Sequence, residues 1–160
     1  MTAEGFYIRE DAITQNIQYL LEEVNSAPIL VFFGSGHTLK TRGYISMNVP
    51  EFKSWAQRLS ESGVEIYSVS IWALSGDTDW RGVEHEVVLH PDRMSFDDGT
   101  TLSMLFDSVP DYAVIYIDLR LDATRSFRFG NPYEDIPAGE MYDGIIVFRK
   151  VNPMKDACPR

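Results

Sequence analysis

The stretch YAVIYIDLRLD, which covers residues 112–122, alternates apolar and polar side chains more regularly than any other part of the chain. Its apolar set recurs at every second position: Ala113, Ile115, Ile117, Leu119 and Leu121. The positions between them include Tyr116, Asp118, Arg120 and Asp122. Successive side chains of a β-strand point to opposite faces of a sheet, so this stretch predicts a strand with one buried and one solvated face. We therefore expect a sheet that packs on a core with one of its faces.

Six further segments have the β-branched and aromatic composition, or the short apolar run, that is typical of strands. They are residues 29–33, 42–47, 64–74, 82–90, 125–129 and 145–151. Gly34-Ser35-Gly36 and Ser75-Gly76-Asp77 have the composition of turns, so we expect the chain to turn at both places. Neighbouring strands that are joined by such short turns pair antiparallel.

Three segments show the 3.6-residue spacing of amphipathic helices. The first is residues 11–24, with Ile13, Ile17, Leu20, Leu21 and Val24 on one face. The second opens near Pro50 after the capping residue Asn48, buries Phe52, Trp55, Ala56 and Leu59, and stops at Gly63. The third starts at Asp98 or Thr100 and buries Leu102, Leu105, Phe106 and Val109 before Pro110.

The predicted order is helix, strand, strand, helix, strand, strand, helix and then three strands. This order favours an α+β domain: a mostly antiparallel sheet with about three helices packed on it. The chain has 160 residues, which is the usual length of one domain. We expect a single domain over residues 1–152 and a short C-terminal tail over residues 153–160.

Cysteine use and hydropathy bear on the compartment. Cys158 is the only cysteine, so neither a disulfide framework nor a cysteine-based zinc site can form within the chain. The first eleven residues lack the apolar core of a secretory signal. The longest apolar runs are also far too short to span a bilayer. A cytoplasmic protein is therefore expected.

The formal charge of −10 decides which partners the chain can have. Binding to phosphate backbones or to anionic membranes depends on clustered Lys and Arg, so we expect neither direct nucleic-acid binding nor membrane binding. A stretch with a superficial likeness to a phosphate loop, GSGHTLKT at residues 34–41, lacks the second glycine and is followed by strand-like residues. No cofactor is predicted.

One group of residues could carry catalysis, and it gives the alternative function. Glu84, His85, Glu86 and His90 could serve a small metal-assisted hydrolase or phosphodiesterase. On a strand, Glu84 and His90 would lie roughly 20 Å apart and could not share one ion. A solvated strand face explains the same pattern, and we expect no enzyme and no metal site.

The acidity is concentrated in two blocks, residues 75–111 with a net charge of −7 and residues 131–143 with −4. Large apolar side chains stand among these acids, as they do in protein interfaces. The predicted contact residues are Asp77, Asp79, Trp80, Glu84, Glu86, Asp92, Phe96, Asp97, Asp98, Tyr133, Glu134, Asp135, Glu140 and Tyr142. Charge of one sign on a surface speeds association with a partner of the opposite sign.

These features predict a small acidic inhibitor that blocks a basic protein, either a toxin or an enzyme that acts on nucleic acid. Its size, charge and compartment are those of immunity proteins and of anti-defence inhibitors as a class, although no motif is shared. We expect a monomer or a weak homodimer. A third interpretation is a structural subunit whose apolar loops form a homo-oligomer.

Overall fold

A computed structural model describes residues 3–25, 27–41, 52–80, 83–86, 91–129 and 136–151. The helices in chain order are α1 (Ala3–Glu23), the 3-10 turn η1 (Ser35–His37), α3 (Trp55–Glu61), the 3-10 turn η2 (Pro91–Arg93), α4 (Leu102–Asp107) and α5 (Ala138–Met141). The strands are β1 (Val69–Trp80), β2 (Val83–Glu86), β3 (Val114–Asp118) and β4 (Gly144–Val151). Within these residues, no helix combines the length and the apolar character needed to cross a membrane.

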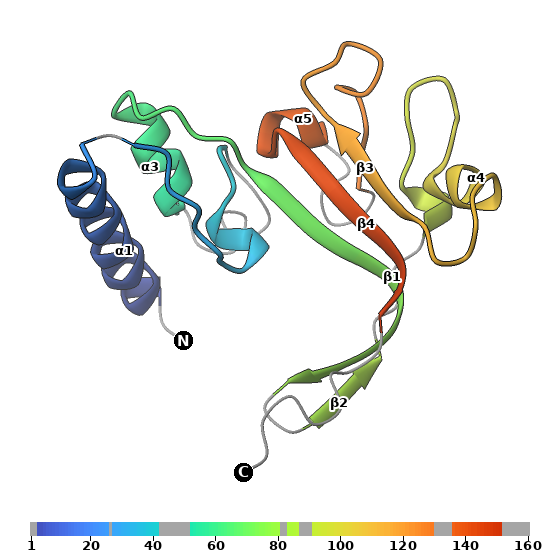
Figure 1. The fold of residues 1–160 in the computed structure, drawn as a ribbon, viewed down its shortest axis with the longest axis horizontal. Helices are drawn as coiled ribbons and strands as arrows, with labels where there is room; N and C mark the ends of the chain where they lie inside the picture. The colour runs from blue at the N-terminus through green and yellow to red at the C-terminus, as the bar shows by residue number, and fades with distance from the viewer. Residues whose placement is uncertain are drawn as a thin grey trace.

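The strands form one sheet in the order β2-β1-β4-β3, and Figure 1 shows β1 and β4 as its long central pair. The pairs β1–β2 and β3–β4 are antiparallel, whereas β1 and β4 run parallel. The predicted α+β class is confirmed, and the sheet is mixed. The parallel pair joins residues 75 positions apart in sequence, so the rule that short turns give antiparallel neighbours does not apply to it.

One face of the sheet carries the larger core. The alternation predicted for residues 112–122 is confirmed as far as Leu119, since Ile117 and Leu119 are buried and Tyr116 is exposed, but β3 ends at Asp118 and Leu121 is 57% exposed. Phe127, at the centre of this core, lies 4.8 Å from Phe96 and 5.7 Å from Phe129 between ring centroids. The other buried members are Leu39, Leu74, Met94, Leu102, Phe106, Ala138, Met141, Tyr142, Ile145 and Val147.

A second, smaller core lies between α1 and α3. Its buried members are Ile17, Trp55, Ala56 and Leu59. Two extended segments, residues 27–33 and residues 64–68, flank it and pack alternate apolar side chains against it. The predicted helical face around Trp55 is confirmed. On the first helix Ile13, Ile17 and Leu21 pack on this core as predicted, but Leu20 and Val24 are exposed. Helix α1 starts eight residues earlier than predicted, and α3 is capped by Ser54, whose Oγ accepts the Gln57 N–H at 3.0 Å. The predicted start at Asn48 and Pro50 lies outside the described residues.

The structure differs from the prediction in the strands near two turns. Residues 29–33 are extended but pair with no other strand among the described residues. The turn expected at residues 75–77 is absent, because β1 runs through it to Trp80. Gly76 permits this with φ of 116°, and a Cβ there would overlap the carbonyl oxygen of Val151 on β4. The strand expected at residues 42–47 lies outside the described residues, and residues 125–129 form only a single bridge, Ser95 to Arg128.

Candidate functional site

The first acidic block begins on the hairpin formed by β1 and β2. Asp77 lies opposite Glu86, and Asp79 lies opposite Glu84. Directly opposed residues of antiparallel strands share a face, as do positions two apart on one strand. The backbone register therefore places four acidic positions on one face of this two-stranded ribbon. We call these four positions the acidic hairpin face. Trp80, which pairs with Val83, belongs to the opposite face.

The other acidic contact residues predicted in the first block lie in η2 and the loop after it. Asp92 in η2 and Asp97 and Asp98 in the loop are all exposed. The Asp98 carboxylate accepts the Thr100 N–H at 2.8 Å, and this hydrogen bond lowers the pKa of Asp98. Asp98 thus has a local role in shaping the turn. Phe96 is half-buried against Phe127, so it serves the core more than the surface.

The second block contributes less to the surface than the sequence suggests. Glu140 is exposed on α5. Tyr142 is only 3% exposed, and its ring meets Phe129 edge-on at 6.0 Å, so it is a core residue and no contact anchor. It is the C-cap of α5, two residues before β4, and it lies in an unbroken run of buried residues, 141–145. Tyr133, Glu134 and Asp135 lie outside the described residues.

The described acidic groups occupy two separate places. The loop after η2 and α5 both attach to residues 127–128, through Ser95 N–H to the Arg128 carbonyl at 3.2 Å and Ala138 N–H to the Phe127 carbonyl at 2.7 Å. The hairpin lies beyond the other end of β1, away from α5 (Figure 1). The acidic hairpin face is therefore a surface of its own.

The metal-assisted alternative gains no support from the described residues. No group of three or more His, Cys, Asp or Glu in that part of the chain is arranged to hold a metal ion. His90 lies outside it. The register also places His85 opposite Thr78, on the ribbon face away from Glu84 and Glu86.

A second surface, which the sequence did not reveal, is the sheet face turned away from the larger core. Ile71, Ile146 and Tyr116 form one row across β1, β4 and β3, and Ala73, Phe148 and Val114 form the next row. Ile71 is 57% exposed and Val114 is 51% exposed. These two rows are called the open face. Exposed apolar patches of this kind mark interaction surfaces in soluble proteins.

Aromatic and charged groups border the open face near the start of β1. The hydroxyls of Tyr67 and Tyr116 are hydrogen-bonded, and the Arg120 guanidinium stands 4.8 Å above the Tyr67 ring. The hydrogen bond from Tyr67 and burial raise the pKa of Tyr116 to about 12. Two Arg120 hydrogen bonds, at 2.9 and 2.7 Å, lower the pKa of Asp118 to about 2.

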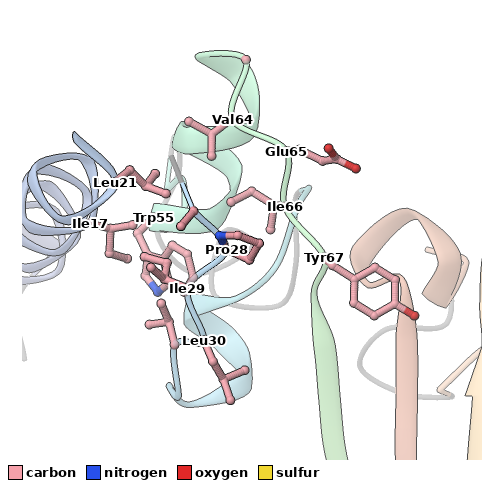
Figure 2. A pocket seen from close by; sticks show the side chains of 13 residues that line it. Ile17, Leu21, Pro28, Ile29, Leu30, Trp55, Val64, Glu65, Ile66 and Tyr67 are labelled. Atoms are coloured by element: carbon pink, nitrogen blue, oxygen red, sulfur yellow. The ribbon is translucent and has the colours of Figure 1, made fainter. Parts of the chain in front are cut away.

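A groove separates the two extended segments that flank the smaller core. It consists of two adjoining cavities of about 730 and 520 Å³, and both are lined by Leu30, Val31, Trp55, Ile66 and Tyr67. Figure 2 shows the first cavity between residues 28–30 and 64–67, with Trp55 beneath it. The second cavity continues along β1 to Ile71. We call the two cavities together the strand groove.

Two buried carboxylates link the segments that form the walls of the strand groove. Glu10, which is fully buried, contacts His37 Nδ1 through Oε1 and accepts the Trp55 N–H through Oε2 at 2.7 Å. Asp143 pairs with Lys40 Nζ at 2.5 Å and accepts the Ser68 N–H at 2.8 Å. The first carboxylate ties α1 and η1 to α3, and the second ties the segment after η1 to the sheet.

One sequence signal for the groove existed. Residues 28–33 are apolar on both faces, a composition typical of strands that are covered on both sides. In the structure Leu30 and Phe32 are 82% and 78% exposed. The signal for the open face was the pair Val114 and Tyr116, which bring apolar surface to the solvated side of the predicted strand.

No family model matches this chain, and no curated protein or solved structure matches it either. Its function therefore has to follow from its own residues.

Proposed function

We propose that the chain is a small acidic binding protein that blocks a basic partner through the acidic hairpin face. The observation that supports this proposal is the register of the hairpin, in which acidic positions oppose acidic positions twice. Directly opposed like charges destabilise a strand pair, and a cross-strand pair is worth about 0.2–1 kcal/mol. A cationic partner would turn this repulsion into attraction.

The chemistry of the partner follows from the charge. An enzyme that acts on nucleic acid needs a cationic cleft, and a protein of net charge −10 is complementary to such a cleft. The proposed role is that of an immunity-type or anti-defence inhibitor in the reducing cytoplasm. The exposed residues Asp92, Asp97, Asp98 and Glu140 add long-range attraction without belonging to the contact face.

Capture followed by an enzyme assay tests this function. The chain, immobilised at about 50 mM salt, should retain a basic nuclease or deaminase from its native host and should inhibit that enzyme when both are purified. Retention should fall at about 300 mM salt, where exposed charges are screened. The variant Asp77→Lys with Asp79→Lys should lose retention and inhibition. The control Glu22→Lys with Glu23→Lys, which changes the net charge equally on exposed α1 positions, should keep both.

The proposal fails if the two charge-reversed variants behave alike, because net charge alone would then explain retention. It also fails if the retained protein is not inhibited.

The open face favours a second candidate, a subunit that forms a homo-oligomer by covering this face with another copy. Association through Ile71, Val114 and Tyr116 would be largely insensitive to salt. Sedimentation at several salt concentrations separates the two functions, since an inhibitor that uses only the hairpin stays monomeric. The variant Ile71→Lys should dissociate such an oligomer into monomers.

A further inference from the structure

Two extended segments face each other across the strand groove without pairing. Among the described residues, the backbone of residues 28–33 makes no hydrogen bond. On the opposite wall, one edge of β1 pairs with β4. The other edge of β1 pairs with no described strand between Val69 and Gly76. Extended backbone with unpaired N–H and C=O groups is a template for another strand.

The direction of the free backbone groups follows from Ser68. Its carbonyl accepts the amides of Asp143 and Gly144, and so points toward β4. Peptide groups of successive residues in a strand point to opposite edges. The N–H and C=O of Val69 and Ile71 therefore point into the groove, which both residues line.

Two residues that line the groove carry buried polar atoms without partners. Trp55 Nε1 and Ser70 Oγ make no hydrogen bond, although their residues are only 5% and 1% exposed. Both residues line the second cavity. Both atoms are enclosed by protein, and Ser70 shares a row of the sheet with the core residue Ile145, so the case for a ligand rests on the unpaired backbone.

The side-chain alternation of the walls defines the chemistry of that ligand. Ile29 and Val31 pack on the smaller core, whereas Leu30 and Phe32 are exposed. Figure 2 shows the same alternation opposite, with Val64 and Ile66 turned toward Trp55 and with Glu65 and Tyr67 turned away. A strand between these walls would direct every second side chain onto Trp55. Its other side chains would lie on the face of Glu65, the one charged residue among the described residues that line the groove.

We propose that the strand groove binds an extended segment of a partner protein, hydrogen-bonded as a strand on both of its edges. The segment alternates apolar residues with hydroxyl or basic residues. Residues 66–71 form about 17 Å of wall, enough for a strand of five or six residues. This peptide site is distinct from the acidic hairpin face, and it stands or falls independently of the inhibitor function.

A synthetic peptide tests the site directly. The probe is acetyl-Thr-Val-Lys-Val-Thr-Val-amide with a fluorescent label, titrated with the intact protein and followed by anisotropy. We expect saturable binding that weakens about tenfold or more when alternate backbone nitrogens are methylated, because methylation removes donors and leaves the side chains. Replacement of the peptide lysine by glutamate should weaken binding about threefold or more, since it faces Glu65.

The variant Glu65→Lys separates binding from folding. It should weaken the probe about threefold or more, because Glu65 lies on the groove face that meets the lysine of the probe, and it should leave the unfolding midpoint unchanged, because Glu65 is exposed. The matched control Glu22→Lys, at an exposed position of α1, should leave the affinity unchanged.

Three results would overturn the peptide site. The first is equal binding of the methylated and unmethylated probes. The second is binding that Glu65→Lys does not change. The third is slow hydrogen exchange of the amides of residues 29–33 in the free protein, whether monomeric or dimeric, because these edges would then already be paired. Rapid exchange that slows when the probe is added would support the site.

Discussion

Glu10 is a fully buried carboxylate that links three elements around the strand groove, and replacing it should cost much of the stability of that region. Its Oε1 contacts His37 Nδ1 in η1, and its Oε2 accepts the Trp55 N–H at the start of α3 at 2.7 Å. In Glu10→Ala the buried Trp55 N–H and the partly buried His37 ring both lose their partner. Removing one member of a buried, hydrogen-bonded pair typically costs about 3–5 kcal/mol.

A conservative variant separates the contributions of charge and hydrogen bonding. Glu10→Gln keeps the volume and an oxygen for the Trp55 N–H, so we expect a loss of only about 1–2 kcal/mol. For a chain of this length, the Glu10→Ala loss corresponds to a fall in Tm of roughly 6–20 °C. The control Glu22→Ala, at an exposed position on the same helix, should stay within about 0.5 kcal/mol of wild type.

Urea unfolding followed by tryptophan fluorescence and by circular dichroism measures these free energies. Coincident transitions by the two probes would justify a two-state treatment. The reasoning would be refuted if the free energy of unfolding of Glu10→Ala were within about 1 kcal/mol of wild type. The loss of a buried carboxylate that bridges η1 and α3 should cost more than that.

Three further predictions concern the larger core, the tyrosine pair and the strand that replaces the expected turn. Phe127→Ala should lower the free energy of unfolding by about 3–5 kcal/mol, whereas Phe32→Ala at an exposed position should change it by less than about 0.5 kcal/mol; chemical denaturation measures both. Tyr67→Phe should bring the pKa of Tyr116 down from about 12 toward 10, as followed by NMR titration of the tyrosine rings. Because folding raises the pKa of Tyr116, its contribution to stability is complete below pH 10 and should be lost as the pH rises toward 12. This loss should occur in wild type and not in Tyr67→Phe. Gly76→Ala should destabilise the protein by more than about 1 kcal/mol, because alanine fits neither the positive φ nor the space beside β4; an unchanged melting temperature would contradict this.

Local sequence patterns predicted the elements that bury one face against a single hydrophobic core. The alternation in residues 112–122 identified β3 and its buried side, and the spacing of Ile13, Ile17 and Leu21 identified the inner face of α1. These patterns succeed because burial of a single face imposes its period on the sequence. The α+β class followed from the order of the elements.

Pairing between segments far apart in the chain could not be predicted from the sequence. Residues 29–33 have strand composition, yet they lie across a groove from β1 instead of pairing with it. Ser75-Gly76-Asp77 has turn composition, but the positive φ of Gly76 is accommodated inside β1. In both places the structure depends on a contact with a distant segment, and local composition does not reveal such a contact.

The candidate site was predictable only in part, for a similar reason. Acidic residues marked the hairpin, but only the register showed that four of them share one face. Tyr142 has the composition of an interface anchor and is buried instead. Glu10 lies just before the helix predicted over residues 11–24, and its burial depends on η1 and α3, which come later in the chain.

The measurement closest to the central proposal is the association rate constant between the chain and the basic enzyme that it captures, taken by stopped flow over a series of salt concentrations. A docking face of four carboxylates predicts a rate that falls about tenfold or more between roughly 30 and 300 mM salt. The same face predicts that Asp77→Lys with Asp79→Lys removes most of this dependence, while Glu22→Lys with Glu23→Lys retains it. Identical rates and salt slopes for the two variants would contradict the proposal that the hairpin is where the partner binds.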